Sequence, residues 1–115
     1  MSVIILTDQN FDAEVIKNEE LVLVDMYSEW CPPCQLMHPI IEELAEKLTG
    51  KIKVGKLDVD ANEKTASFYK IKTIPTFLIF KKGEVVQKTV GAGPITVLES
   101  AIRGLEVNER NKDLE

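Results

Sequence analysis

The chain has 115 residues, of which 44% are hydrophobic, and this is enough apolar material for one domain with a single core. Its 19 acidic and 14 basic residues give a net charge of -5, which argues against nucleic acid or an anionic membrane surface as the main partner. No stretch has the length of a membrane span, and the N-terminus lacks the basic region and long apolar run of a secretory signal. We therefore expect a cytoplasmic protein without a membrane partner.

The first half of the chain alternates between strand and helix patterns. Residues 3–6 predict a short strand, and residues 11–16 carry apolar side chains at the spacing of a helix face. Residues 21–27 are a nearly unbroken apolar run, which is typical of a central strand buried on both faces. Apolar side chains then recur at helical spacing over residues 37–48, and Gly50 offers a stop. This half therefore predicts two strands, each followed by a helix.

The second half changes from this alternation to a hairpin. A strand is predicted at residues 52–59, and Asn62 is the expected N-cap of the short helix that follows. Two further strands are predicted at residues 76–80 and 84–90, and the Lys-Lys-Gly sequence between them is a hairpin signal. The last two strands should therefore be antiparallel.

Residues 95–105 carry the apolar stripe of a last helix, and the composition then becomes polar and charged. We expect one domain over residues 1–107 and a frayed polar tail over residues 108–115. The predicted order of elements is β-α-β-α-β-α-β-β-α. This order predicts an α/β fold in which four helices flank a central mixed sheet of five strands.

The segment Cys31-Pro32-Pro33-Cys34 holds the only two cysteines of the chain, at the predicted start of the second helix. Proline suits the first helical positions because it lacks the N–H that these positions leave unpaired. A residue before proline is pushed toward extended geometry, so Cys31 is the expected N-cap. There the free N–H groups and the positive end of the helix dipole favour a thiolate. The sequence therefore predicts a reactive dithiol.

Three other interpretations of the cysteine pair fit the sequence less well. Structural zinc usually needs four ligands, and besides the two cysteines the chain has His38 as its one histidine. A structural disulfide between residues so close in sequence constrains the unfolded chain little. A Cys-His nucleophile would need His38 to activate a cysteine, yet His38 lies one helical turn beyond Cys34 without an evident orienting partner. We expect no metal and no bound cofactor.

Asp25 interrupts the apolar run at residues 21–27. A buried carboxylate is costly to keep charged, so its pKa should be raised and it could accept a proton near neutral pH. The alternative is that Asp25 turns to a sheet edge or pairs structurally. Acids with perturbed pKa values gather at functional sites, and we therefore expect a functional role for Asp25.

Several short motifs occur together in one order along the chain. They are Val24-Asp25, Trp30-Cys31, Pro33-Cys34, Pro39, Lys56-Leu57-Asp58-Val59-Asp60, Ile74-Pro75-Thr76, Phe80 with Gly83, and Gly91-Ala92. Each motif alone is weak, but their joint order and spacing are very specific. On these residues the chain resembles the thioredoxin family over residues 3–105.

The resemblance implies a protein-disulfide reductase with the thioredoxin fold, and a Cys-x-x-Cys thiol of lowered pKa is a known property of thioredoxins. Cys31 would attack a disulfide in a target protein, and Cys34 would then attack Cys31 and release the reduced target. Asp25 would deprotonate Cys34 with Lys56 as its partner, although Lys56 alone could equally be an exposed strand lysine. The implied partners are disulfide-containing proteins and a thioredoxin reductase, and we expect a monomer.

The resemblance also implies a substrate-binding surface around Cys31. Pro75 is expected to follow a cis peptide bond and to face the dithiol, which leaves the backbone of Ile74 free to pair with an extended target segment. For Trp30 and Ile74 the alternative is ordinary core packing. The expected substrate-binding residues are Trp30, Pro32, Pro33, Ile74, Pro75, Gly91 and Ala92.

Two positions depart from the usual pattern of the family or add to it. Pro32 replaces the more usual glycine and removes a backbone N–H near the sulfur of Cys31, so we expect a changed redox potential, with no direction predicted. His38 could be a polar residue on the solvent face of the helix, which we favour, or a titrating charge near Cys34.

Three other functions stay open from the sequence. The first is a thiol oxidant or isomerase of the same fold with a less reducing potential, which the unusual Pro32 allows. The second is a binding module that presents its apolar groove to a partner while the cysteines are dispensable. The third is a zinc ion or cluster bound between two chains through Cys31 and Cys34.

Overall fold

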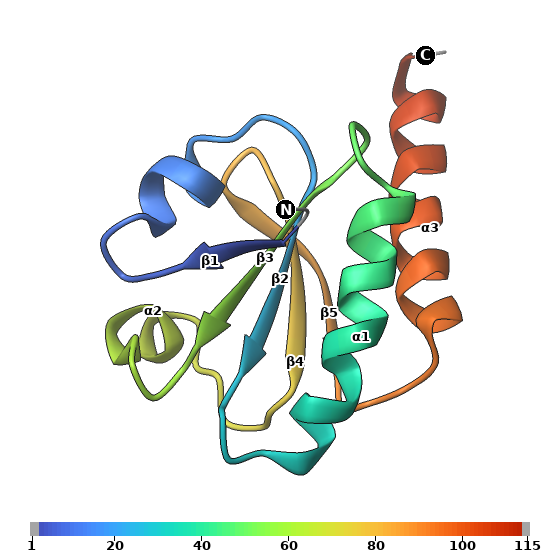
Figure 1. Ribbon diagram of the computed structural model, residues 1–115. Coiled ribbons are helices and arrows are strands. Elements are labelled where there is room, and N and C mark those ends of the chain that lie inside the picture. Colours follow the sequence, from blue (N-terminus) through green and yellow to red (C-terminus); the bar gives the residue numbers. More distant parts are fainter. Residues whose placement is uncertain (1–2, 114–115) are drawn as a thin grey trace.

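The computed structural model describes residues 3–113, and its centre is a five-stranded mixed sheet with helices on both faces (Figure 1). The strands lie in the order β1-β3-β2-β4-β5, with β1, β3 and β2 parallel and with β4 and β5 antiparallel to their neighbours. Their bounds are β1 Val3–Leu6, β2 Val22–Tyr27, β3 Lys53–Asp58, β4 Thr76–Lys81 and β5 Glu84–Val90. The predicted mixed sheet is confirmed.

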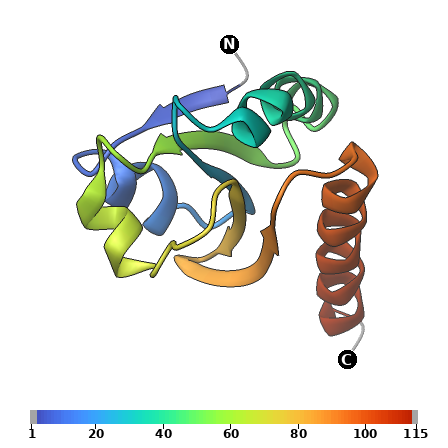
Figure 2. The same cartoon turned by 90° about the horizontal axis from the view of Figure 1, so that it is seen from below.

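In this part of the chain, four helices cover the two faces of the sheet, as predicted. Their bounds are η1 Asp12–Ile16, which is a short π-helix, α1 Pro32–Lys47, α2 Glu63–Phe68 and α3 Ile95–Asp113. Helices α1 and α3 lie on one face, where Met37 and Leu98 pack against Leu23 of β2. Figure 2 shows η1 and α2 on the other side, where Phe11 and Val15 belong to a second apolar cluster.

Strand β2 is buried at every position, as expected for a central strand. Because successive side chains of a strand point to opposite faces, its six residues divide into two sets. Val22, Val24 and Met26 pack in the cluster on the η1 face, whereas Leu23 packs against α1. Asp25 and Tyr27 follow Leu23 in this alternation, so their side chains lie on the α1 face. The chain thus places a carboxyl under the helix that begins with the cysteine segment.

The N-terminus of α2 is capped differently from the sequence prediction. Asn62 occupies the N-cap position, but its side chain makes no capping bond to the helix. Its Oδ1 accepts from the Asp8 backbone N–H at 2.9 Å, and its Nδ2 donates to the Asp58 carbonyl at 3.0 Å. The N–H of Thr65 in the first turn instead donates to Asp8 Oδ1 at 2.9 Å. A carboxylate from 57 residues away in the sequence therefore satisfies the helix end.

The β4–β5 hairpin closes through Lys82 and Gly83, both of which have positive φ angles of 51° and 81°. Two central residues in this region form the turn that matches the twist of paired strands. Gly83 is also required by space, because a Cβ here would lie 2.8 Å from the carbonyl oxygen of Ile16. The hairpin turn is thereby packed against the end of η1.

The backbone of α3 continues to Asp113, although the polar composition predicted a frayed tail from residue 108. Glu, Arg and Lys are good helix formers, so a polar segment can extend a helix without burying a face. The last part of the predicted tail, residues 114–115, lies outside the described residues, and the domain boundary at residue 107 stays a prediction. Over residues 3–113, none of the helices combines the length and the hydropathy that a membrane span requires.

Candidate active site

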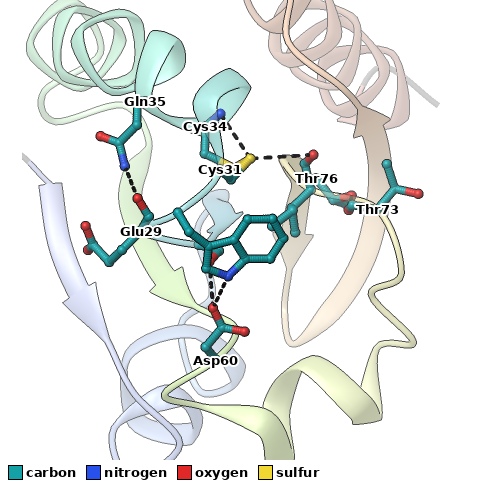
Figure 3. The surroundings of a disulfide bond; sticks show 10 residues. Glu29, Cys31, Cys34, Gln35, Asp60, Thr73 and Thr76 are labelled. Carbon is teal, nitrogen blue, oxygen red and sulfur yellow. Dashed lines mark hydrogen bonds between the residues drawn. A yellow bond between two sulfur atoms is a disulfide. The ribbon is translucent and has the colours of Figure 1, made fainter.

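The cysteine segment forms the start of α1, as the sequence predicted (Figure 3). Cys31 is the N-cap with extended backbone angles of φ -93° and ψ 107°, and Pro32 and Pro33 are the first two helical residues. The sulfurs of Cys31 and Cys34 are joined in a disulfide, with 5.2 Å between the two Cα atoms. In the described part of the chain, the cysteine segment included, no three His, Cys, Asp or Glu side chains are grouped to hold a metal ion.

The backbone N–H of Cys34 donates to the sulfur of Cys31 at 3.3 Å. Neither Pro32 nor Pro33 has an N–H, so Cys34 supplies the only donor among the first three helical residues. Cys34 is fully buried, whereas Cys31 keeps 3% of its surface exposed, so Cys31 is the outer residue of the pair. In the reduced form this N–H and the helix dipole would both favour a thiolate at Cys31.

Asp25 lies in the middle of the sheet with no exposed surface. Within the described residues, neither of its carboxylate oxygens has a hydrogen-bond partner. Burial raises the pKa of Asp25 to about 7, and the positive charge of Lys56 acts in the opposite direction. The alternative of a sheet-edge Asp25 is wrong, because β2 is the central strand. Asp25 is therefore poised to exchange a proton near neutral pH.

Lys56 lies beside Asp25 in the pairing of β3 with β2. It is half-buried, and its Nζ lies 5.6 Å from the centre of the Tyr27 ring. Burial and the nearby acids Glu29 and Asp58 raise the pKa of Tyr27 to about 12, so its hydroxyl stays protonated at neutral pH. Lys56 is thus not a freely exposed strand lysine, and its charge acts on Asp25.

The segment before β4 comes close to the disulfide, and the peptide bond between Ile74 and Pro75 is cis, as expected. The carbonyl oxygen of Ile74 lies 3.9 Å from the sulfur of Cys31, a van der Waals contact because a disulfide sulfur carries no proton. Ile74 is half-buried against Tyr27 and the two cysteines. The Gly91 N–H donates to the Pro75 carbonyl at 2.8 Å. The end of β5 is thereby fixed next to the cis proline.

The remaining predicted surface residues are exposed around this point. Pro32, Pro33 and Ala92 are exposed, and Trp30 is 72% exposed. Core packing of Trp30 is therefore wrong. Of the other three predicted substrate-binding residues, Ile74 and Gly91 are half-buried and Pro75 is buried, so Pro75 offers little side-chain surface. The role of these seven residues in binding stays a prediction.

Asp60 was not predicted as a site residue. Its Oδ2 accepts from Trp30 Nε1 at 2.8 Å and from Ser28 Oγ at 2.6 Å, as the dashed lines at Asp60 in Figure 3 show. Ser28 is fully buried, so Asp60 joins an exposed indole to the fixed end of β2. The only sign of Asp60 in the sequence was its place at the end of the matched segment 56–60.

His38 does not lie on the solvent face of α1, so the favoured prediction for this residue is wrong. It is half-buried, and its ring meets the Tyr27 ring edge-on with 5.1 Å between their centres. Burial lowers the pKa of His38, and the Lys56 charge lowers it further. The charges of Glu29 and Glu42 act in the opposite direction, but the net effect on the His38 pKa is downward, which favours the neutral ring near Cys34.

Comparison with known proteins agrees with the family resemblance seen in the sequence. The sequence model of the thioredoxin family matches residues 2–104. A thioredoxin of Buchnera aphidicola subsp. Schizaphis graminum is 49% identical over 90 residues, which cover 78% of this chain and 83% of the relative. Thioredoxin 2 of Chlorobaculum tepidum is 50% identical over 88 residues, with coverage of 76% and 81%. The thioredoxin of Bacillus subtilis is 41% identical over 102 residues, with coverage of 89% and 96%.

Proposed function

The chain belongs to the thioredoxin family and is a protein-disulfide reductase, and we propose that Cys31 is its attacking thiol and Cys34 its resolving thiol. The observation that carries this assignment is the position of Cys31. It is the outer residue of the pair, and its sulfur sits at the helix N-terminus where the Cys34 N–H reaches it. Both features favour a reactive thiolate at this position.

The reaction is two successive exchanges between thiolates and disulfides. The Cys31 thiolate attacks one sulfur of a target disulfide, which forms a mixed disulfide and releases the other target sulfur as a thiolate. Cys34 loses its proton and attacks Cys31, which reforms the internal disulfide and releases the second target sulfur. Two electrons have then passed to the target. Both cysteines lie on one helical turn, with 5.2 Å between their Cα atoms, so the second attack is intramolecular and is favoured over escape of the mixed disulfide.

Asp25 is proposed as the base that takes the Cys34 proton before the second attack. Three features support this role: Asp25 lies on the α1 face of β2, it has no other hydrogen-bond partner among the described residues, and its pKa is about 7. A base with a pKa near the working pH is efficient in proton transfer. Lys56 is proposed to tune this base, because its charge keeps the Asp25 pKa from rising further.

The target segment is proposed to bind across the surface next to Cys31. The backbone of Ile74 lies against the Cys31 sulfur, so a target chain that pairs there by strand addition would bring its disulfide to that sulfur. The exposed Trp30 and Ala92 and the half-buried Gly91 are proposed to supply apolar surface, and the buried Pro75 holds the Ile74 backbone in place through its cis peptide bond. Pro32 and Pro33 are exposed at the same helix end and complete the proposed binding surface.

The proposal includes an electron donor and a setting. Each turnover leaves the Cys31–Cys34 disulfide, so a flavin enzyme of the thioredoxin reductase type is proposed to reduce it with NADPH. The chain would then work as a monomeric electron carrier in cellular redox homeostasis. We propose the cytoplasm as its location, because a Cys-x-x-Cys pair in a reducing compartment is typically catalytic.

Coupled reduction of insulin by NADPH and a thioredoxin reductase tests the function. We expect insulin reduction that requires both cysteines. A folded protein that fails in this assay would instead be a binding module of the same fold. Equilibration against a glutathione buffer then measures the potential, and a value well above the glutathione potential would indicate an oxidant or isomerase. Equal potentials for wild type and Pro32→Gly would reject an effect of Pro32.

A further inference from the structure

A groove of about 260 Å³ lies beside the proposed target-binding surface, between the end of β5 and the start of α3. Its floor is formed by Met37, Phe77 and Leu98, each no more than 2% exposed. Val90 and Val97 line it as well, although they are 52% and 46% exposed. The groove therefore brings two exposed valines together over a buried apolar floor.

The chemistry of this lining selects an uncharged apolar occupant. Among the lining side chains, only Thr89 carries a polar group, and none carries a charge. A closed apolar cavity of about 150 Å³ can hold a benzene molecule, so this groove has room for a leucine or phenylalanine side chain. Met37 in the floor is flexible and polarisable, which suits contact with side chains of different shapes.

A shared helix and a chain of backbone contacts connect the groove to the disulfide. Met37 follows Cys34 by three positions on α1, and both are buried, so they lie on the same helix face about one turn apart. On the other side, Gly91 lines the groove and donates its N–H to the Pro75 carbonyl. The neighbouring Ile74 carbonyl in turn contacts the Cys31 sulfur. The groove is therefore a continuation of the surface around the dithiol.

We propose that this groove is a specificity subsite that takes an aliphatic or aromatic side chain of the target segment, near the cysteine that Cys31 attacks. This inference rests on the proposed function and adds the kind of target that is preferred. An extended segment points alternate side chains to opposite sides, so one residue near its cysteine can enter the groove while others face solvent. Burial of such a side chain should raise kcat/KM roughly tenfold to hundredfold over glycine at the same position.

The test uses short peptides with one cysteine, each bound through a disulfide to 5-thio-2-nitrobenzoate. The Cys31 thiolate attacks the peptide sulfur and releases the coloured thiolate, which has the lower pKa and leaves more readily. Cys34 then releases the peptide thiol. Leucine, glycine or lysine is placed in turn at successive positions on each side of the cysteine. The measured quantity is the ratio of kcat/KM between the leucine and glycine peptides.

Val97→Asp places a charge in the wall of the groove at a half-exposed position in the first turn of α3. Thr96→Asp is its matched control, because Thr96 is exposed on the same turn and does not line the groove. We expect Val97→Asp to abolish the preference for leucine and to favour the lysine peptide. Thr96→Asp should keep the preference of the wild type. An unchanged leucine-to-glycine ratio in Val97→Asp would overturn the proposal.

Gly93→Leu tests the same groove by adding a large side chain to its lining. A Cβ at Gly93 meets no atom within 4 Å, so the side chain can be accommodated, and Gly104→Leu is a control of the same kind further along α3. The filled groove should lose the leucine preference, whereas Gly104→Leu should keep it. Absence of any preference in the wild type would also overturn the proposal, as would a wild-type dimer in sedimentation experiments that Val97→Asp dissociates and Thr96→Asp does not. If the proposed function itself were wrong, the wild type would reduce none of the peptides. This result is distinct from reduction of all peptides without a preference for leucine.

Discussion

Lys56 lies directly beside Asp25 in the parallel pairing of β3 with β2, and its positive charge opposes the effect of burial on the Asp25 pKa. Within the described residues, the Asp25 carboxylate has no hydrogen-bond partner, so this charge is the main interaction that favours its ionised form. Lys56 therefore keeps the pKa of Asp25 near 7. Without this charge the pKa would be higher, and the carboxyl would be protonated at pH 7.

Asp25→Asn should stabilise the protein at pH 8. The pKa of Asp25 is raised from 3.8 to about 7 on folding, so the contribution of Asp25 to stability is fully present below about pH 4 and is lost as the pH rises through about 7. Above pH 7 the raised pKa of Asp25 corresponds to a loss of about 4 kcal/mol in the free energy of unfolding. Urea unfolding of the oxidised protein at pH 4 and pH 8 measures it. Glu46→Gln on the exposed face of α1 should change the stability little at either pH. If Asp25→Asn were no more stable than the wild type at pH 8, the assignment would be contradicted.

Lys56→Met should move the pH dependence of the resolving step to higher pH. Loss of the positive charge raises the Asp25 pKa, so less of the base is ionised at pH 7 and target release slows several-fold. Single-turnover release from a preformed mixed disulfide at Cys31, followed from pH 5 to pH 9, measures the midpoint. Lys56→Arg keeps the charge and should keep the midpoint. A midpoint that does not move in Lys56→Met would show that Lys56 does not tune the base.

Cys34→Ser should trap the target as a stable mixed disulfide on Cys31. The substitution removes the resolving sulfur but leaves the backbone N–H that reaches the Cys31 sulfur. Mass spectrometry after incubation with a disulfide-containing protein should detect one target per chain, and Cys31→Ser should give no adduct. Equal adducts on the two variants would mean that either sulfur attacks.

Asp60→Ala should loosen Trp30, because Asp60 Oδ2 accepts the hydrogen bond of the indole N–H. Trp30 is the only tryptophan of the chain, so its fluorescence anisotropy reports its motion directly. We expect a lower anisotropy and a severalfold higher KM for protein disulfides. Ser28→Ala removes the hydrogen bond that ties Asp60 to the end of β2 but keeps the bond to the indole, and it should lower the anisotropy less than Asp60→Ala does. If Trp30 moved no more freely in Asp60→Ala, the positioning role of Asp60 would be wrong.

Asp8→Ala should destabilise α2 and lower the melting temperature. The Asp8 carboxylate accepts hydrogen bonds from the backbone N–H and the hydroxyl of Thr65, which also lower its pKa. Hydrogen exchange at the Thr65 N–H should therefore become faster. Glu63→Ala alters an acid in the same helical turn without removing these bonds, and it should have the smaller effect. Equal exchange rates in the two variants would argue against capping by Asp8.

Local patterns were sufficient to predict most of the fold. The apolar run of β2 indicated a central strand, and the two prolines after Cys31 fixed the start of α1, because both follow from properties of neighbouring residues. The Asp25 pKa was predictable for the same reason, since burial of the surrounding run implied burial of the carboxyl. The boundary of α3 was less predictable, because polar composition does not by itself end a helix.

The contacts that were missed all join different elements of the fold. Asp8 caps α2 from 57 residues away, and Asp60 binds Trp30 from 30 residues away. The contact between His38 and Tyr27 likewise depends on how α1 packs on β2. Such partners are set by sheet order and helix packing, and no local spacing rule encodes them. The resemblance to a family indicated the region of Asp60 but not its bonds.

The two prolines after Cys31 leave Cys34 as the one early donor to the outer sulfur. Position 34 therefore acts twice in a catalytic cycle, first through its amide, which prepares the nucleophile, and later through its side chain, which ends the covalent complex. A substitution such as Cys34→Ser removes only the second of these functions, because it leaves the backbone amide unchanged. Replacing that amide with an ester would remove the N–H donor and keep the Cys34 thiol. The attack of Cys31 on the target and the release of the target could then be impaired separately at a single residue.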